Sequence, residues 1–289
     1  MPRILTEQQI MCFRANGYLF PLDALAPVEV ATYRDELRQT EARLGASLMD
    51  VDRKYRGNLH FLCCWLDELI RHPAILDVVE DLLGPDLLLY TSRFFIKEPR
   101  SDEVAAWHQD STYFGLRPFD HTTAWVALSK VTKEAGPVEF ATGSHIRGQL
   151  LQRSNMVKNS VNTAGQTIIE WFDKSHTECA VLAPGQFSLH HTCTVHQSAP
   201  NRSDERRIGI ALSYIPTRVR HIGSQRMPAS LVRGIDRFGH FDLQPRPMRD
   251  FGPEETARHD RSFKAYLDSF YEQLKIAERD LPTDTVDAA

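Results

Sequence analysis

The sequence is poor in cysteine and has neither a long apolar run nor an excess of positive charge. Its five cysteines are an odd number and form no CxxC pair, which argues against a disulfide framework and a thiolate zinc site. A reducing cytoplasm is therefore expected. No apolar run is long enough to span a bilayer, and no secretory signal is recognisable. The formal net charge of -4 argues against general affinity for nucleic acids or anionic membranes.

The chain also lacks internal repeats, low-complexity tracts and an obvious linker. With 289 residues, 42% of them hydrophobic, it can bury a large core. We expect a single domain over residues 1–289. Its parts are a helical region to about residue 84, a strand-rich core over about 85–216, and a variable loop with a C-terminal helix over about 217–289.

Helices are predicted mainly at the two ends of the chain. Thr6 and Gln9 have the spacing of a capping box, and Gly17 is a suitable helix end. Further helices are expected over Val28–Leu44, over Pro73–Gly84, and from Pro253 to about Arg279, where apolar residues recur at helical spacing.

Strands are predicted in the middle of the chain, in three segments rich in β-branched and aromatic residues: Leu87–Glu98, Thr122–Val131 and Arg206–Pro216. Turn residues such as Gly136 and Pro137 separate them, without alternating helices. This pattern favours an antiparallel barrel or sandwich over a doubly wound parallel sheet.

The stretch WHQDSTYF places His108 and Asp110 two residues apart among aromatics. On a strand, both side chains would point to the same face. A third ligand could come from FSLHHTCTVHQSAPN, which contains His190, His191 and His196. Two histidines and one carboxylate suit non-haem Fe(II) that reacts with dioxygen, although a bare HxD is weak evidence.

The order and spacing of WHQD, TTAWVAL, EFATGSH, SLHH and HQSAPNRSDERRIG resemble the phytanoyl-CoA dioxygenase (PhyH) family, as does the opening TEQQIMCFRANGYLF. The resemblance extends from Thr6 to about Pro216. It implies a mainly β fold with flanking helices, built on a double-stranded β-helix, a cupin-like jelly roll. It also implies an enzyme that couples 2-oxoglutarate decarboxylation to oxidation of a C–H bond by O2.

The resemblance implies a role for individual residues of this sequence. The residues that match the family's Fe(II) ligands are His108, Asp110 and His196. Arg207 matches the arginine that binds the far carboxylate of 2-oxoglutarate, a task that suits a guanidinium fork. Further positions expected around this cosubstrate are Ser198, Trp125, Gln109 and Lys97.

Hydroxylation of an unactivated C–H bond in a small metabolite is the implied reaction. Halogenating relatives carry Ala or Gly where Asp110 stands, which disfavours a halogenase; a desaturase is left open. A non-catalytic metal- or ligand-binding jelly roll and a zinc hydrolase are further alternatives, but neither has a use for Arg207. The oligomeric state, monomer or homodimer, is also open.

The segment Thr217–Asp250 contains seven Arg and no Lys. It suggests an anionic or carrier-linked substrate, contacted by Arg218 or Arg220, or alternatively a loop held by surface ion pairs. Tyr113 and Phe114 are candidates for the substrate pocket wall or for the core. We expect supporting, turn or packing roles for His190, His191, Glu139, His145 and Cys193.

Overall fold

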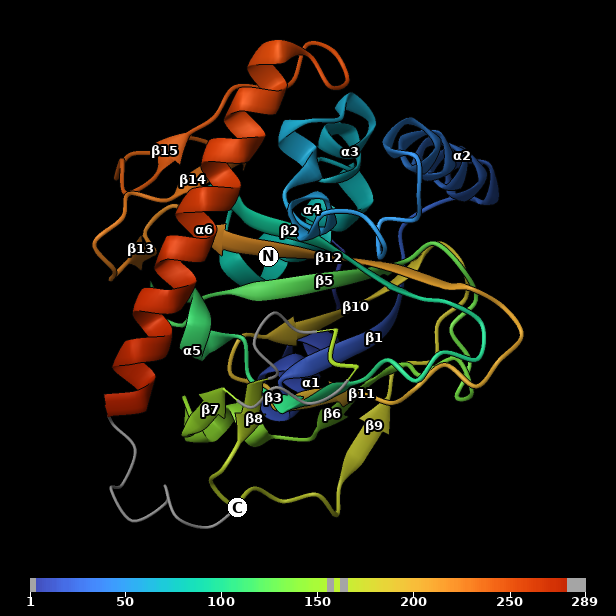
Figure 1. Ribbon diagram of the computed structural model, residues 1–289. Coiled ribbons are helices and arrows are strands. Elements are labelled where there is room, and N and C mark those ends of the chain that lie inside the picture. Colours follow the sequence, from blue (N-terminus) through green and yellow to red (C-terminus); the bar gives the residue numbers. More distant parts are fainter. Residues whose placement is uncertain (1–3, 155–158, 162–165, 280–289) are drawn as a thin grey trace.

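The computed structural model describes residues 4–154, 159–161 and 166–279. Two β-sheets face each other, and most of the helices cover the outer face of the larger one (Figure 1). The larger sheet has the order β1 (Tyr18–Asp23), β10 (Gln186–His191), β5 (Thr122–Ala127), β12 (Arg207–Pro216), β2 (Leu87–Lys97), β14 (Pro228–Arg233) and β15 (Asp242–Leu243). The smaller sheet has the order β3 (Ala105–His108), β11 (His196–Ser198), β6 (Val138–Ala141) and β9 (Thr177–Cys179).

All pairings within these two sheets are antiparallel except that of β14 with β15. Two short ribbons pair β13 (Arg220–His221) with β4 (Leu116–Arg117) and β7 (Gln152–Ser154) with β8 (Gln166–Ile168). This arrangement confirms the predicted double-stranded β-helix with flanking helices.

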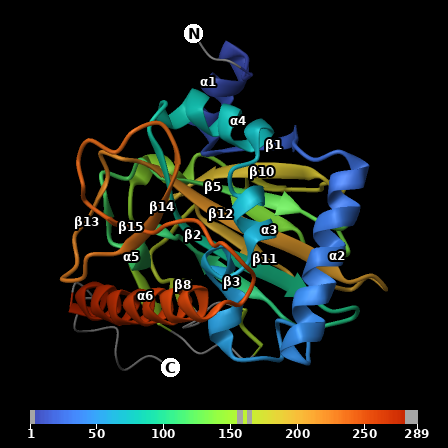
Figure 2. The same ribbon diagram turned by 90° about the horizontal axis from the view of Figure 1, so that it is seen from above.

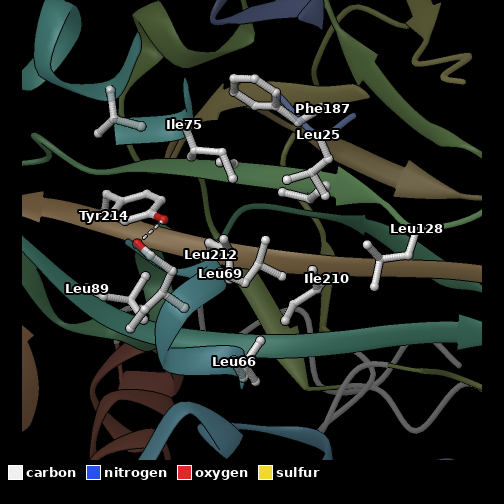
Figure 3. Packing of buried hydrophobic residues seen from close by; sticks show 14 of the residues in the cluster. Leu25, Leu66, Leu69, Ile75, Leu89, Leu128, Phe187, Ile210, Leu212 and Tyr214 are labelled. Carbon is white, nitrogen blue, oxygen red and sulfur yellow. Dashed lines mark hydrogen bonds between the residues drawn. The ribbon is translucent and has the colours of Figure 1, made fainter. Parts of the chain in front are cut away.

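Alternation along β12 separates the core from the interior of the β-helix. One face carries Ile208, Ile210, Leu212 and Tyr214, which pack under the helices in the main hydrophobic cluster (Figure 3). The Tyr214 hydroxyl also donates to the Ile70 carbonyl at 2.8 Å. The opposite face carries Arg207, Gly209, Ala211 and Ser213. This polar and small set leaves room between the sheets.

The predicted helices are present, with small differences at their ends. They are α1 (Glu7–Asn16), α2 (Pro27–Leu44), α4 (Pro73–Leu83) and α6 (Pro253–Arg279). Thr6 and Gln9 form the capping box, and Gly17 ends α1 in a left-handed conformation. The structure adds α3 (Cys64–Leu69), α5 (Ser111–Phe114) and the 3-10 turns Arg53–Arg56, Leu59–Phe61 and Ser144–Arg147. None of the described helices is long and apolar enough to cross a membrane.

Several parts of the sequence-based assignment were incomplete. The helical N-terminal region contains β1, which pairs with β10 and thereby joins the larger sheet. The segment Thr217–Asp250 contains β14, which pairs with β2. Strand β5 ends at Ala127 rather than at Val131. The two overlooked strands are short and pair with partners far away in sequence, so no local pattern reveals them.

Candidate metal centre

The inner faces of the two sheets enclose a cavity. Its lining combines aromatic and aliphatic side chains with a few polar and charged groups, as is common in ligand pockets. Strands β2, β5 and β12 line one side, and the ends of β3 and β11 line the other. Phe263 and Tyr266 enter from α6, which runs along the side of the β-helix (Figure 1). Figure 2 shows α6 along one edge of the molecule and α2 along another.

Three of the predicted ligands lie together in this cavity. His108 ends β3 and stands opposite His196 on β11, and their ring centroids are 4.1 Å apart. Asp110 Oδ1 lies 3.9 Å from His108 Nε2 and 4.0 Å from His196 Nε2. The potential ligand atoms of the three residues all lie within 4.8 Å of one another. In the described part of the chain, this is the one such group of three.

The reason why His108 and Asp110 converge differs from the prediction. Strand β3 ends at His108, so strand alternation does not orient Asp110. Asp110 has helical dihedral angles, φ −73° and ψ −30°, and precedes the short helix α5. A tight turn after the strand brings the carboxylate back toward the two imidazoles.

Backbone contacts prepare both imidazoles to bind a cation. His108 Nδ1 lies 2.7 Å from the Ala106 carbonyl oxygen, and His196 Nδ1 lies 2.9 Å from the Thr194 carbonyl oxygen. A carbonyl oxygen can only accept, so each Nδ1 carries the proton and each Nε2 keeps a free lone pair. Burial lowers the pKa of both histidines and favours the neutral form that metals require.

Asp110 stays ionised although it is enclosed. Burial raises the pKa of its carboxyl group, but the contact with His190 and the neighbouring imidazoles outweigh this effect and hold the pKa well below its usual range. His190 Nε2 lies 3.6 Å from Oδ2, whereas Oδ1 faces His108 and His196. The two carboxylate oxygens therefore have different neighbours, one toward the potential ligands and one toward β10.

Arg207 lies in the same cavity and is 2% exposed. Its Nη1 donates to the Gly136 carbonyl and its Nη2 to the Phe95 carbonyl at 3.5 Å, while Nε has no hydrogen-bond partner among the described residues. The guanidinium lies 5.3 Å from the centroid of the Trp125 ring. No ion pair joins it to a carboxylate in the described chain, so it is a buried cation with capacity for an anion.

Lys97 lies outside the cavity lining and contacts Ser198, which lines the cavity near Arg207. It is fully buried, and Nζ donates to Ser198 Oγ at 2.6 Å and to the Ser198 carbonyl at 3.3 Å. Ser198 lines the cavity, whereas Lys97 does not. The interpretation of Lys97 as a direct polar contact is therefore replaced by a role in orienting Ser198.

The sequence placed Gln109 beside the cosubstrate, but in the structure its side chain does not face the cavity. Its side chain donates to the carbonyls of Gly148 at 2.9 Å and Cys193 at 2.6 Å, and accepts from the Leu150 amide at 2.7 Å. Gln152 Oε1 accepts from its backbone amide. All these bonds are internal, so Gln109 fastens the metal-binding turn to neighbouring loops.

The predicted substrate residues divide into two groups. Tyr113 and Phe114 line the cavity, Tyr113 stacking on Phe270 of α6 at 5.0 Å between centroids. Arg218 and Arg220 do not line it. Arg218 is half exposed and pairs with Asp120 at 2.9 Å, and Arg220 is exposed on the β13–β4 ribbon.

Other arginines of Thr217–Asp250 also form ion pairs within the protein. Arg233 pairs with Asp77 at 2.6 Å, Arg237 with Asp86 at 2.9 Å and Arg246 with Asp67 at 2.5 Å. These ion pairs favour the alternative interpretation of the arginine-rich segment as a loop held by ion pairs.

Histidines and other residues near the motifs have the supporting roles expected from the sequence. His191 Nδ1 accepts from the Cys193 amide, and the His191 ring packs against His145. Glu139 accepts from Gln197 and from a threonine on β9. Burial raises the pKa of Cys193 to about 11, consistent with an inert thiol.

Asn58, Arg93 and Tyr266 are among the cavity-lining residues that sequence reasoning missed. The spacing of Thr91, Arg93, Phe95 and Lys97 on an otherwise apolar strand was the available signal for Arg93. No comparable signal existed for Asn58 and Tyr266, which reach the cavity from a connecting loop and from the C-terminal helix.

Comparison with known proteins gives consistent matches. The phytanoyl-CoA dioxygenase (PhyH) family matches residues 13–209. A probable alpha-ketoglutarate-dependent hypophosphite dioxygenase from Stutzerimonas stutzeri is 27% identical over 182 residues, 62% of each chain. A methylphosphonate hydroxylase from Gimesia maris is 23% identical over 85% of this chain and 98% of that protein. The structure titled non-heme monooxygenase, ThoJ apo, has a TM-score of 0.81 and 31% identity over 93% of this chain and 99% of ThoJ.

The matched part spans 62% of the Stutzerimonas protein and 50% of a probable phytanoyl-CoA dioxygenase from Caenorhabditis elegans. The names of these relatives agree with the class of enzyme and the cofactors predicted from the sequence. The family match covers more than half of the chain and includes all three clustered residues of the metal centre. The chain therefore belongs to the phytanoyl-CoA dioxygenase family.

Proposed function

We propose that this protein is an Fe(II)- and 2-oxoglutarate-dependent dioxygenase that hydroxylates an unactivated C–H bond of a small metabolite. One observation carries the proposal: a buried group of two histidines and one carboxylate shares its cavity with a buried arginine that has no carboxylate partner among the described residues. The two histidines and the carboxylate suit Fe(II) with open coordination positions, and the arginine suits a dicarboxylic cosubstrate.

In this proposal the metal is held by the free Nε2 atoms of His108 and His196 and by Asp110 Oδ1. When bound, iron and 2-oxoglutarate supply the oxidising chemistry with O2. Arg207 binds the far carboxylate of 2-oxoglutarate, assisted by the Ser198 hydroxyl and by the Trp125 ring beside the guanidinium. The enclosing aromatic side chains exclude water from the reacting groups.

The same residues weigh against the other candidate functions. Asp110 fills a ligand position that halogenating relatives leave to chloride, so hydroxylation is favoured over halogenation. A non-catalytic metal-binding jelly roll or a zinc hydrolase gives no task to Arg207, whose burial is costly without an anion. Desaturation would use the same metal centre and is the remaining alternative reaction.

An anionic substrate is also part of the proposal. Relatives include proteins named for hypophosphite, methylphosphonate and 1-deoxypentalenic acid. A second acid in the cavity would need a cation other than Arg207, and the cavity contains one in Arg93.

The test is anaerobic addition of Fe(II) and 2-oxoglutarate to the apoprotein. We expect a weak visible charge-transfer band from the chelated keto acid, lost in Asp110→Ala and weakened in Arg207→Ala. Arg202→Ala is the matched control, because Arg202 is exposed and paired with Asp102 away from the cavity. Absence of the band in wild type, or zinc as the bound metal, would contradict the proposal. A screen for succinate formation then identifies substrates.

A further inference from the structure

Arg93 is a second cation in the cavity and has no assigned partner. It is half-buried on β2, and no described residue forms an ion pair with it or accepts a hydrogen bond from its guanidinium. Its guanidinium carbon lies 5.8 Å from the centroid of the Phe95 ring. Burial lowers the pKa of Arg93; the neighbouring Tyr266 opposes this effect, and the positive charge of Arg53 adds to it. The surroundings thus leave a positive charge unneutralised.

The strand register separates Arg93 from the proposed 2-oxoglutarate site. Arg207 stands opposite Lys97, and Arg93 stands opposite Ala211, four residues further along the ladder. At roughly 3.3 Å per residue the two positions are about 13 Å apart. The two arginines are therefore anchored at different positions along the cavity wall. Ala211 also separates Arg93 from Trp125, and its small side chain leaves space above the sheet.

The Tyr266 hydroxyl is the second polar group without a partner in this part of the cavity. Tyr266 enters from α6, and no described residue hydrogen-bonds to its hydroxyl. Burial, tempered by the charge of Arg93 and reinforced by that of Asp110, raises the pKa of Tyr266. Both charges act on this side chain, so Tyr266 lies near Arg93 and near the metal centre.

Neighbouring polar groups are already engaged with each other. Asn58 Oδ1 accepts from Thr91 Oγ1 at 2.8 Å and from the Ser92 amide at 3.1 Å. Thr123 Oγ1 and Ser213 Oγ lie 3.2 Å apart and share a hydrogen bond. Among the described residues, Arg93 and Tyr266 therefore each keep a donor for a ligand.

We propose that Arg93, assisted by Tyr266, binds the anionic head of the primary substrate, an organic carboxylate or phosphonate whose target C–H bond extends toward the metal centre. This inference rests on the proposed function. A guanidinium and an oxyanion form two parallel charge-assisted hydrogen bonds. A neutral analogue would leave the guanidinium unpaired, so the site selects acids.

The experiment uses protein loaded with Ni(II) and 2-oxoglutarate and measures binding by calorimetry. The probes are hexanoate, hexylphosphonate and hexanamide, the last being the neutral counterpart of hexanoate. We expect both acids to bind wild type at least about 10-fold more tightly than the amide. Arg93→Met should abolish this preference, and Arg93→Lys should retain part of it. The tighter of the two acids indicates whether the natural head is a carboxylate or a phosphonate.

Arg237→Met is the matched control, because it removes an exposed arginine that pairs with Asp86 outside the cavity. It should keep the preference for acids. Equal binding of hexanoate and hexanamide, no binding of either acid, or a preference that survives Arg93→Met would overturn the inference. Chelation of 2-oxoglutarate is recorded first in the same samples. Its failure contradicts the proposed function, whereas intact chelation without acid selectivity contradicts only the role of Arg93.

Discussion

Lys97 and Arg207 stand directly opposite each other on β2 and β12, so two buried basic side chains are cross-strand neighbours. Like charges in this position destabilise a sheet. Burial and then the charge of Arg207 lower the pKa of Lys97 to about 6. The pairing of Lys97 with Arg207 therefore lowers the stability of the fold at the end of the cavity where an anion is expected.

This cost should appear as a pH dependence of stability. An unfolded lysine has a pKa of about 10.4, so between about pH 6 and pH 10 the unfolded chain binds more protons at Lys97 than the folded chain. The free energy of unfolding should rise with pH in this window, by up to about 1.4 kcal/mol per pH unit from this group. Urea unfolding of the apoprotein at several pH values measures the slope.

Lys97→Met should flatten that slope, because methionine fills a similar volume without a charge. Lys130→Met is the control, since Lys130 is exposed. If the wild type and Lys97→Met show the same slope between pH 6 and 9, Lys97 is charged in the folded protein and the argument fails.

His190 should tune metal affinity without being a ligand. Its Nε2 lies 3.6 Å from Asp110 Oδ2, the carboxylate oxygen turned away from His108 and His196. In His190→Phe the carboxylate loses the neighbour that fixes its orientation, and metal affinity should fall by about 10- to 100-fold. Titration with Ni(II) measures this, with thermal unfolding as a separate check of the fold. His191→Phe is the matched control on the same strand; an equal loss there would refute the positioning role.

Sequence predicted those parts of the site that depend on spacing along the chain. His108, Asp110, His196 and Arg207 were identified from motif order, and the structure brings all four to one cavity. The capping box at Thr6 was likewise readable, because it is a local hydrogen-bond pattern.

Contacts between distant segments were not predictable in this way. Strand β1 belongs to the larger sheet only because β10, far along the chain, offers an edge. Arg93 on β2 and Tyr266 on α6 line the same cavity, and neither residue belongs to a recognisable sequence motif. Asp110 was placed correctly for the wrong reason, since a turn rather than a strand orients it.

Gln109 should be important for stability rather than for cosubstrate binding. Gln109→Leu leaves the Gly148 and Cys193 carbonyls and the Leu150 amide without their present partner. Burying such groups unpaired should cost about 3 kcal/mol or more of unfolding free energy. Chemical unfolding measures it, with the exposed Gln39→Leu as control. Unchanged stability combined with weakened 2-oxoglutarate binding would instead support the pocket position predicted from the sequence.

Gly209 should be indispensable because the Trp125 ring occupies the space of a side chain there. A Cβ atom at Gly209 would lie 1.9 Å from Trp125 Cζ2, so Gly209→Ala must displace the ring that flanks Arg207. We expect a loss of about 1–3 kcal/mol in unfolding free energy and weaker 2-oxoglutarate binding. Trp125→Phe in the same chain should recover stability, since a smaller ring makes room for the methyl group, without restoring binding. Comparing both single variants with the double variant separates the steric effect from the loss of the indole. If Gly209→Ala matched wild type in stability and binding, the ring would not be fixed against Arg207 and the assigned role of Trp125 would be wrong.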